Sequence, residues 1–391
     1  MHAKRPRRLL IYLALGGLLL CLLGAGLSAA SNLGLPSRSV VADRLSEVEK
    51  AHLAEAVHLR QAIGDVVWPG WGGADIPIIV YNEAFVFLVG YPDPPPGWVK
   101  VPGAIARGGP WEPVPGDTFG GQPYYRQALP SPAVTPQAFV VQVGERWAAS
   151  MTTYEWTHIE LANEIRGGLP ALLKPFVPYR LVVLPFNSDW HIAALEHESF
   201  HAYQGLMAPD RLLAAETANH AVEADYPWDD SDFRQAWQTE LDNLVKAMQA
   251  TTPTETARLA REFLQARAAR RAEHGLTTAL VDFERQREWL EGLAKYAELE
   301  SWRRGAMTAG YEPLPALDSD ADFKAYTGFE QRWSSEITTS RNQASVKGDG
   351  RFYYSGWAQA VLLDRLAPGW QAQSFADGVW LEDLLSSAAA P

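Results

Sequence analysis

Two histidines four residues apart, in the segment His197-Glu198-Ser199-Phe200-His201, constrain the fold of this chain more than any other feature. In an α-helix, residues i and i+4 lie one above the other on the same face. The two imidazoles could then bind one metal ion, with Glu198 beside them as a general base for a metal-activated water. The pattern therefore predicts a helix whose histidine-bearing face lies opposite a further metal ligand.

The residues around the motif favour such a helix. Apart from Arg180, residues 180–186 are apolar and contain a proline near their end, which predicts a buried strand. Three good N-cap residues follow at 187–189, and we predict a helix over residues 189–206. The alternative interpretation is that His197 and His201 are structural side chains and Glu198 a solvated charge.

A catalytic zinc site needs a third protein ligand besides the two histidines, and it keeps one position open for water. The metzincin spacing is excluded, because positions 204 and 207 are Gln204 and Met207 rather than Gly and His. The third ligand must therefore come from elsewhere in the chain.

Residues 291–298 read Glu-Gly-Leu-Ala-Lys-Tyr-Ala-Glu. An H-E-x-x-H motif followed at a distance by E-G-x-A-x-Y resembles bacterial zinc peptidases of the gluzincin type, over about residues 181–300. The resemblance implies a zincin-like fold, a Zn²⁺ cofactor, hydrolysis of peptide bonds, and Glu291 as the third zinc ligand. Gly292 would let the helix approach the metal closely, and Glu298 could orient a zinc-bound histidine. Lys295 replaces the Asp of thermolysin-like enzymes, which argues against a close thermolysin relative.

A second group of residues competes for the role of third ligand. His220 follows His201 by 19 positions, the separation at which aminopeptidase-type gluzincins place their Glu ligand. Glu216 and Glu223 share its helical face. All three could equally form a solvated surface, so the choice between this group and Glu291 stays open.

Hydrolysis through an oxyanion also requires a hydrogen-bond donor besides the metal. Tyr353 and Tyr354 precede an apolar helix and are candidates, and we name Tyr354 as the catalytic residue to test. His158 and His191 are further options, although each of the four is more often a packing residue.

The N-terminus has the pattern of a targeting segment. Four basic residues within positions 4–8 precede an uncharged apolar run at 9–27, and small residues follow at 28–30. The run is near the minimum length for a membrane span, so residues 1–30 are a signal peptide or an uncleaved anchor. Either form predicts an exported, extracytoplasmic body. Cys21, the only cysteine, lies in this run, so the body has no disulfide and must be stabilised by a packed core.

The net charge excludes one class of function, and the order of the predicted strands and helices gives the fold class. A formal net charge of −12 argues against nucleic-acid binding. We predict an α+β, zincin-like fold: a small, irregular, β-containing N-terminal part (31–157) followed by a mainly helical metal-binding part (158–391). Strands are expected at 76–81, 84–89, 139–143 and 146–153, and helices at 43–63, 158–174, 189–206, 209–224, 230–250, 253–274, 277–304, 322–333 and 354–366.

The function that these patterns favour is an exported zinc metallopeptidase acting on a peptide or protein substrate, tethered to the membrane if its N-terminal segment is not cleaved. The alternative is a non-enzymatic, zincin-like envelope protein that binds a protein or glycan partner. Trp68, Trp71, Trp98 and Trp111 could form such a binding surface, but large aromatics in Gly/Pro-rich segments are more often packed.

Overall fold

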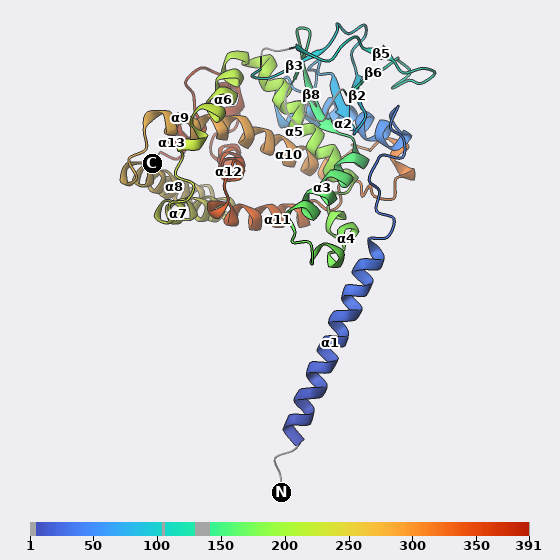
Figure 1. Ribbon diagram of the computed structural model, residues 1–391. Helices are drawn as coiled ribbons and strands as arrows, with labels where there is room; N and C mark the ends of the chain where they lie inside the picture. The colour runs from blue at the N-terminus through green and yellow to red at the C-terminus, as the bar shows by residue number, and fades with distance from the viewer. Residues whose placement is uncertain (1–4, 104–105, 130–140, 391) are drawn as a thin grey trace.

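The computed structural model of the chain describes the backbone of residues 5–103, 106–129 and 141–390, and the same side chains except those of residues 5–11, 13, 14, 18, 20 and 219–221. The fold is α+β: a curled sheet in the N-terminal part is followed by a helical C-terminal part (Figure 1). The predicted order of strands before the motif and helices after it is confirmed.

The sheet has eight strands in the order β4-β3-β7-β8-β1-β2-β6-β5, and within it only the β1–β8 pair is parallel among the described residues. The predicted strands at 76–81, 84–89 and 146–153 correspond to β1, β2 and β8. Of the predicted strand at 139–143, residues 139 and 140 lie outside the described part of the chain. The strands are β1 (Ile78–Tyr81), β2 (Phe85–Val89), β3 (Trp98–Lys100), β4 (Ala106–Arg107), β5 (Glu112–Pro113), β6 (Tyr125–Ala128), β7 (Val141–Val143) and β8 (Arg146–Thr152).

Both faces of the sheet centre are covered by core side chains. Alternate side chains of a strand point to opposite faces, so neighbouring residues of one strand enter different cores. In β8, Trp147, Ala149 and Met151 belong to the main core, whereas Ala148 packs in a second, smaller core. That second core also contains Trp98 and Trp111. Trp68 and Trp71 are buried in the main core, so the packing interpretation of all four tryptophans is confirmed.

The helices largely follow the sequence prediction. The single helix expected over 277–304 is formed by α9, a π-helical turn η4, and α10 in succession. The helix expected at 322–333 starts only at Phe329, because Ala325 and Tyr326 have positive φ angles of 49° and 61°. The helices are α1 (Arg5–Ser31), α2 (Glu47–Val67), α3 (Tyr154–Gly168), α4 (Tyr179–Val183), α5 (Ser188–Met207), α6 (Pro209–Val222), α7 (Ser231–Gln249), α8 (Pro253–Glu273), α9 (Thr278–Arg287), η4 (Glu288–Gly292), α10 (Leu293–Met307), α11 (Phe329–Asn342), α12 (Gly350–Leu366) and α13 (Leu381–Ala388).

The strand predicted at 180–186 is wrong. These residues form the short helix α4 and a turn, and Leu181 and Leu184 are exposed. The sheet has no vacant position next to β8, since β7 and β1 already pair with its two edges. A short apolar run cannot be assigned to strand or helix from its periodicity alone, and here the sheet topology decides.

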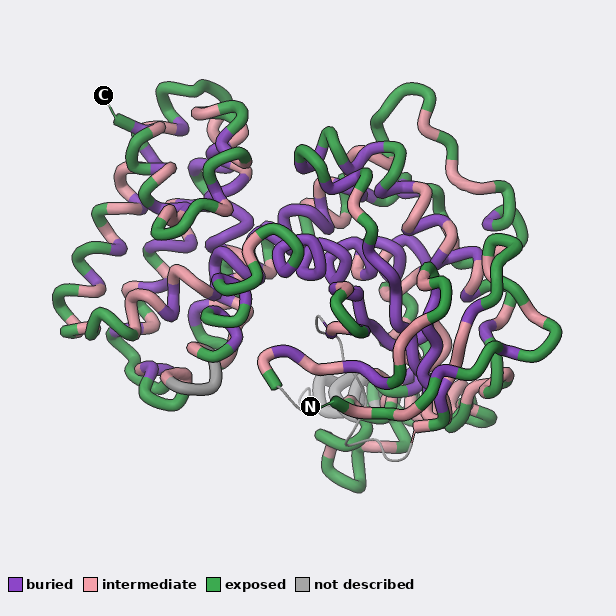
Figure 2. The backbone as a smooth tube through the Cα atoms, turned by 90° about the horizontal axis from the view of Figure 1, so that it is seen from above, coloured by how far each residue is buried: buried purple, intermediate pink, exposed green. Residues whose placement is uncertain are grey.

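The helix that carries the motif, α5, lies at the centre of the molecule. Its N-cap is Asn187, whose side chain accepts a hydrogen bond of 3.0 Å from the Trp190 amide. It packs against β8, and Gly205 permits this contact because a Cβ there would lie 2.5 Å from Trp147. The main core continues from Leu45 to Ala389 and thus joins the N-terminal and C-terminal parts. Figure 2 shows buried segments running through the middle of the molecule, with exposed turns at its outer edges.

At the N-terminal end, α1 projects away from the body (Figure 1). None of the helices, as far as the structure describes their residues, is long and apolar enough to cross a bilayer. Within the apolar run expected at 9–27, the side chains of residues 9–11, 13, 14, 18 and 20 lie outside the described part of the structure.

Candidate metal centre

The helix α5 brings the two motif histidines together. Their rings are 4.7 Å apart, centroid to centroid, and the two Nε2 atoms are separated by 3.1 Å. Both side chains are buried. The helix predicted from the N-cap residues therefore holds His197 and His201 on one face, as the i, i+4 spacing requires.

Glu291 completes the group. It lies on η4, and its Oε2 atom is 3.5 Å from His197 Nε2 and 3.3 Å from His201 Nε2. Among the residues whose side chains are described, these three form the group that could hold a metal ion. The resemblance thus pointed to the residue that the tertiary fold places against both histidines.

The size of this group fits a zinc ion. Zinc bonds of about 2.0–2.1 Å in a tetrahedral arrangement place neighbouring ligand atoms about 3.3–3.4 Å apart. The three observed separations of 3.1, 3.3 and 3.5 Å surround that value. The point in their plane that is equidistant from the three atoms lies about 1.9 Å from each. His197, His201 and Glu291 would therefore be the residues that hold the ion.

The hydrogen bonds behind His201 fix which ring nitrogen is available. Its Nδ1 is 2.8 Å from Oε1 of Gln204. The amide nitrogen of Gln204 donates to the carbonyls of Trp289 and Leu290, so only its oxygen can face the ring. His201 therefore carries its proton on Nδ1 and presents the lone pair of Nε2 to the metal position.

Glu298 lies behind His197. Its Oε2 atom is 3.4 Å from His197 Nδ1, within ion-pair distance but without the geometry of a hydrogen bond. The other carboxylate oxygen accepts from Lys295 at 2.8 Å and from Arg332 at 3.2 Å. The carboxylate expected from the sequence to orient a histidine is thus in contact with it, and Lys295 neutralises that carboxylate.

Glu291 is aimed at the histidines by Arg287, one helical turn earlier. Arg287 donates to Glu291 Oε1 over 2.7 Å and to both oxygens of Asp349, which leaves Oε2 facing the imidazoles. The π turn displaces the register of the helix here, a feature found often at functional sites. Gly292 contacts the α12 backbone rather than the metal position, since a Cβ on it would lie 2.8 Å from the Gly356 carbonyl carbon.

Without a cation, Nε2 of His201 and Oε2 of Glu291 face each other 3.3 Å apart, and both are hydrogen-bond acceptors. Oε2 of Glu291 and Oε2 of Glu198 are buried and have no hydrogen-bond partner among the described residues, an arrangement that is costly unless a positive charge is bound. Burial disfavours the charged imidazole, yet the contacts with Glu291 and Glu298 raise the pKa of His197 to about 10. Without a metal ion, the negative carboxylates around His197 therefore favour its protonated form.

Glu198 has the surroundings of a general base. Burial raises the pKa of its carboxyl group to about 7, although both histidines oppose this shift. A base with a pKa near neutrality can take up a proton and release it again at physiological pH. An occupied metal site would lower this pKa, because a nearby cation favours the carboxylate.

Of the two tyrosines, Tyr353 lies beside the group. Its ring stacks on His197 with centroids 5.5 Å apart and an angle of 9°. Burial, the charge of Glu291 and a hydrogen bond to that residue raise the pKa of Tyr353 well above its usual value. Tyr354, the residue named from the sequence, instead places its hydroxyl 2.5 Å from Glu336 Oε2.

The remaining candidates whose side chains are described lie outside the group that could hold a metal ion. Glu216 is largely buried, with Oε2 3.9 Å from Arg287 Nη1. The side chain of His220 is outside the described part of the structure, and Glu223 is half-buried in a 3-10 turn. His191 contacts the Thr152 carbonyl and His158 the Tyr154 carbonyl. Glu216 is therefore a neighbour of the group rather than part of it.

Sequence reasoning did not assign a role to Gln204, Arg287 or Asp349. Gln204 follows His201 by three positions and Arg287 precedes Glu291 by four, so helical spacing places each on the same face as the ligand it supports. That spacing could have identified Gln204 and Arg287 as supporting residues from the sequence. Asp349 precedes α12 and reaches Arg287 only through the tertiary fold.

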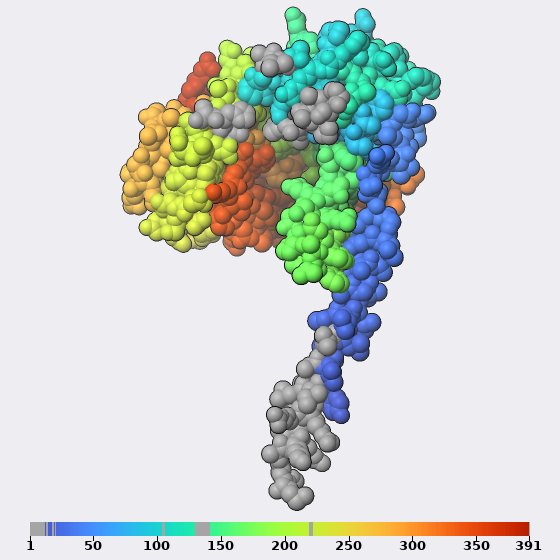
Figure 3. All heavy atoms as spheres, viewed as in Figure 1, coloured from blue at the N-terminus to red at the C-terminus, as the bar shows by residue number. Residues whose placement is uncertain are grey.

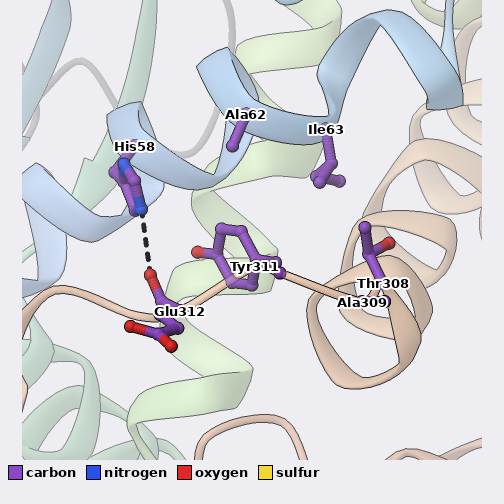
Figure 4. A pocket seen from close by; sticks show the side chains of 8 residues that line it. His58, Ala62, Ile63, Thr308, Ala309, Tyr311 and Glu312 are labelled. Carbon is purple, nitrogen blue, oxygen red and sulfur yellow. Dashed lines mark hydrogen bonds between the residues drawn. The ribbon is translucent and has the colours of Figure 1, made fainter.

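A pocket elsewhere lacks these features. It has a volume of about 420 Å³ and lies between α2 and the segment that follows α10 (Figure 4). His58 stacks on Tyr311 in its wall and bonds the Glu312 carbonyl at 3.0 Å. No residue of the metal group lines it.

The sequence matches no protein-family model, and comparisons with curated proteins and with solved structures gave no significant match.

Proposed function

We propose that this chain is a zinc-dependent hydrolase that cleaves peptide bonds. The observation that supports this most is the buried group of His197, His201 and Glu291, whose separations suit one tetrahedral ion. Two imidazole nitrogens and one carboxylate oxygen, with no thiolate, are typical of catalytic rather than structural zinc. Glu198, next to His197 in the chain, adds a base to this group.

Zinc bound here would supply Lewis acidity and lower the pKa of a water in its open position. Glu198 would accept the proton as the water oxygen bonds to the carbonyl carbon of the peptide. It would then pass that proton to the amide nitrogen, which leaves as an amine when the carbon–nitrogen bond breaks. Atoms and charge balance without a further reactant.

The tyrosine beside His197 is the better placed donor for the developing oxyanion. Tyr353 stacks on His197 and bonds Glu291, so it contacts two residues of the metal group, whereas the hydroxyl of Tyr354 bonds Glu336. Neutral tyrosine can donate its hydroxyl proton to a negative oxygen. We therefore assign this role to Tyr353 and treat Tyr354 as the comparison.

Zinc content and peptide cleavage test the proposal together. We expect one equivalent of zinc in the parent protein, its loss in Glu291→Ala, and its retention in Glu198→Gln. Cleavage of a broad peptide library should be lost in both variants. Glu216→Gln is the matched control, because Glu216 is also buried near the group but lies outside it, and it should keep zinc.

Two results would overturn parts of this assignment. Zinc retained by Glu291→Ala and lost by Glu216→Gln would move the third ligand to α6. Zinc bound as expected, with no Glu198-dependent cleavage of any library peptide, would favour the non-enzymatic binding protein. The basic residues and the apolar run within the first 30 residues support a location of this reaction outside the cytoplasm.

A further inference from the structure

The connection between α3 and α5, residues 169–187, exposes an unusual amount of apolar surface. Its exposed side chains include Leu172 (85%), Leu173 (52%), Phe176 (51%), Leu181 (60%) and Leu184 (62%). Single exposed leucines are normal on soluble proteins. Here five large apolar side chains are exposed within 13 residues, and such a concentration marks a surface that contacts another partner.

The same segment is positively charged in an acidic protein. Residues 165–188 contain no Asp or Glu but include Arg166, Lys174 and Arg180, whereas the whole chain has a formal net charge of −12. Arg180 is exposed, and Lys174 is half-buried. Apolar side chains flanked by cations are typical of segments that lie in the interface of an anionic bilayer.

The patch is fastened to the base of α1. Asn32, just after this helix, donates from Nδ2 to the Val177 carbonyl at 2.7 Å and accepts at Oδ1 from the Tyr179 amide at 3.2 Å. Arg180 donates to the Gly34 carbonyl at 3.0 Å. In Figures 1 and 3, α4 and its turns stand beside the end of α1 that joins the body.

The helix α1 exposes apolar side chains as well. Its leucines whose side chains are described are more than half exposed: Leu15, Leu19, Leu22, Leu23 and Leu27. Together with the patch on residues 169–187 they make two neighbouring apolar surfaces that begin at the same end of the body. A single lipid surface can contact both at once, whereas a small peptide partner would cover only one.

We propose that residues 169–187 dock the body onto an anionic lipid bilayer. The leucines and Phe176 enter the boundary between headgroups and acyl chains, and Arg166, Lys174 and Arg180 contact lipid phosphates. This contact is separate from the hydrolase assignment and would hold the body in a fixed orientation against the membrane.

Site-directed labelling of the full chain tests the contact directly. In a Cys21→Ala background, single cysteines at Leu172→Cys, Leu184→Cys and Met307→Cys carry an environment-sensitive fluorophore. Met307 is the control, because it is also 60% exposed but lies at the end of α10. Vesicles of phosphatidylcholine, with and without phosphatidylglycerol, contain lipids with nitroxide-labelled acyl chains.

We expect the labels at 172 and 184 to shift to shorter emission wavelength and to be quenched in phosphatidylglycerol vesicles, while the label at 307 stays unchanged. Lys174→Gln with Arg180→Gln should reduce this quenching. Three outcomes would overturn the proposal. One is that the labels at 172 and 184 behave like that at 307, although the protein co-sediments with vesicles through α1. Another is equal quenching without phosphatidylglycerol, and the third is a shift that depends on protein concentration alone, which indicates a second copy of the chain.

Discussion

Replacing Gln204 by Leu tests how the structure prepares His201 for a metal ion. Gln204 is fully buried, accepts from His201 Nδ1, and donates to the carbonyls of Trp289 and Leu290. Leu has similar volume but forms none of these bonds. The imidazole then loses the acceptor that keeps its proton on Nδ1 and its lone pair on Nε2.

The expected loss can be stated for two measurements. Outer partners of metal-bound histidines are worth about 10- to 100-fold in metal affinity, or about 1.4–2.7 kcal/mol. The buried donor and acceptors left without partners should cost the metal-free protein about 1–3 kcal/mol of unfolding free energy. Zinc affinity is measured by competition with a chromophoric chelator, and stability by urea unfolding without metal.

The control variant is Gln359→Leu. Gln359 is equally buried and donates to Glu288 Oε2 at 2.9 Å, but it has no contact with either histidine. It should lose a similar amount of stability and keep the parent's zinc affinity. Unchanged zinc affinity in Gln204→Leu, or an equal loss in Gln359→Leu, would refute the reasoning.

Three further predictions address catalysis, packing and pH. Tyr353→Phe should reduce turnover about 100-fold or more with zinc content unchanged, and Tyr354→Phe should not; the reverse result in steady-state assays would reassign the oxyanion donor. Gly292→Ala should destabilise the fold by about 1–3 kcal/mol in urea unfolding, because the new Cβ would lie 2.8 Å from a backbone carbon of α12. Gly167→Ala is the control and should not destabilise the fold, because a Cβ at position 167 has no atom within 4 Å. Burial opposes ionisation of Glu284, yet Arg270 and its neighbours lower the pKa of this carboxyl group from 4.5 to about 2. The ionised carboxylate therefore stabilises the fold above pH 4.5, and this contribution is lost as the pH falls towards 2. Unfolding free energies measured over this range should fall less steeply in Glu284→Gln, and an unchanged slope would show that another carboxylate is responsible.

Local spacing in the sequence determined the part of the site that lies on single helices. The i, i+4 relation places His197 and His201 on one face whatever surrounds them, and Asn187 begins the helix. The helix–strand order followed from hydrophobic periodicity. Glu291 came from a resemblance rather than from spacing, because 90 positions separate it from His201 and no local rule spans that distance.

The tertiary structure decided everything that depends on contacts between elements. It selected Tyr353 over Tyr354 as the neighbour of His197, brought Asp349 to Arg287, and put Gly292 against α12. It also showed that residues 180–186 form part of a short helix and a turn, with Leu181 and Leu184 exposed. An apolar run is equally compatible with a buried strand, a core helix or an exposed surface, because hydrophobicity records only a tendency to leave water. The sheet, whose β8 already has a partner on each edge, determines which of these the run becomes.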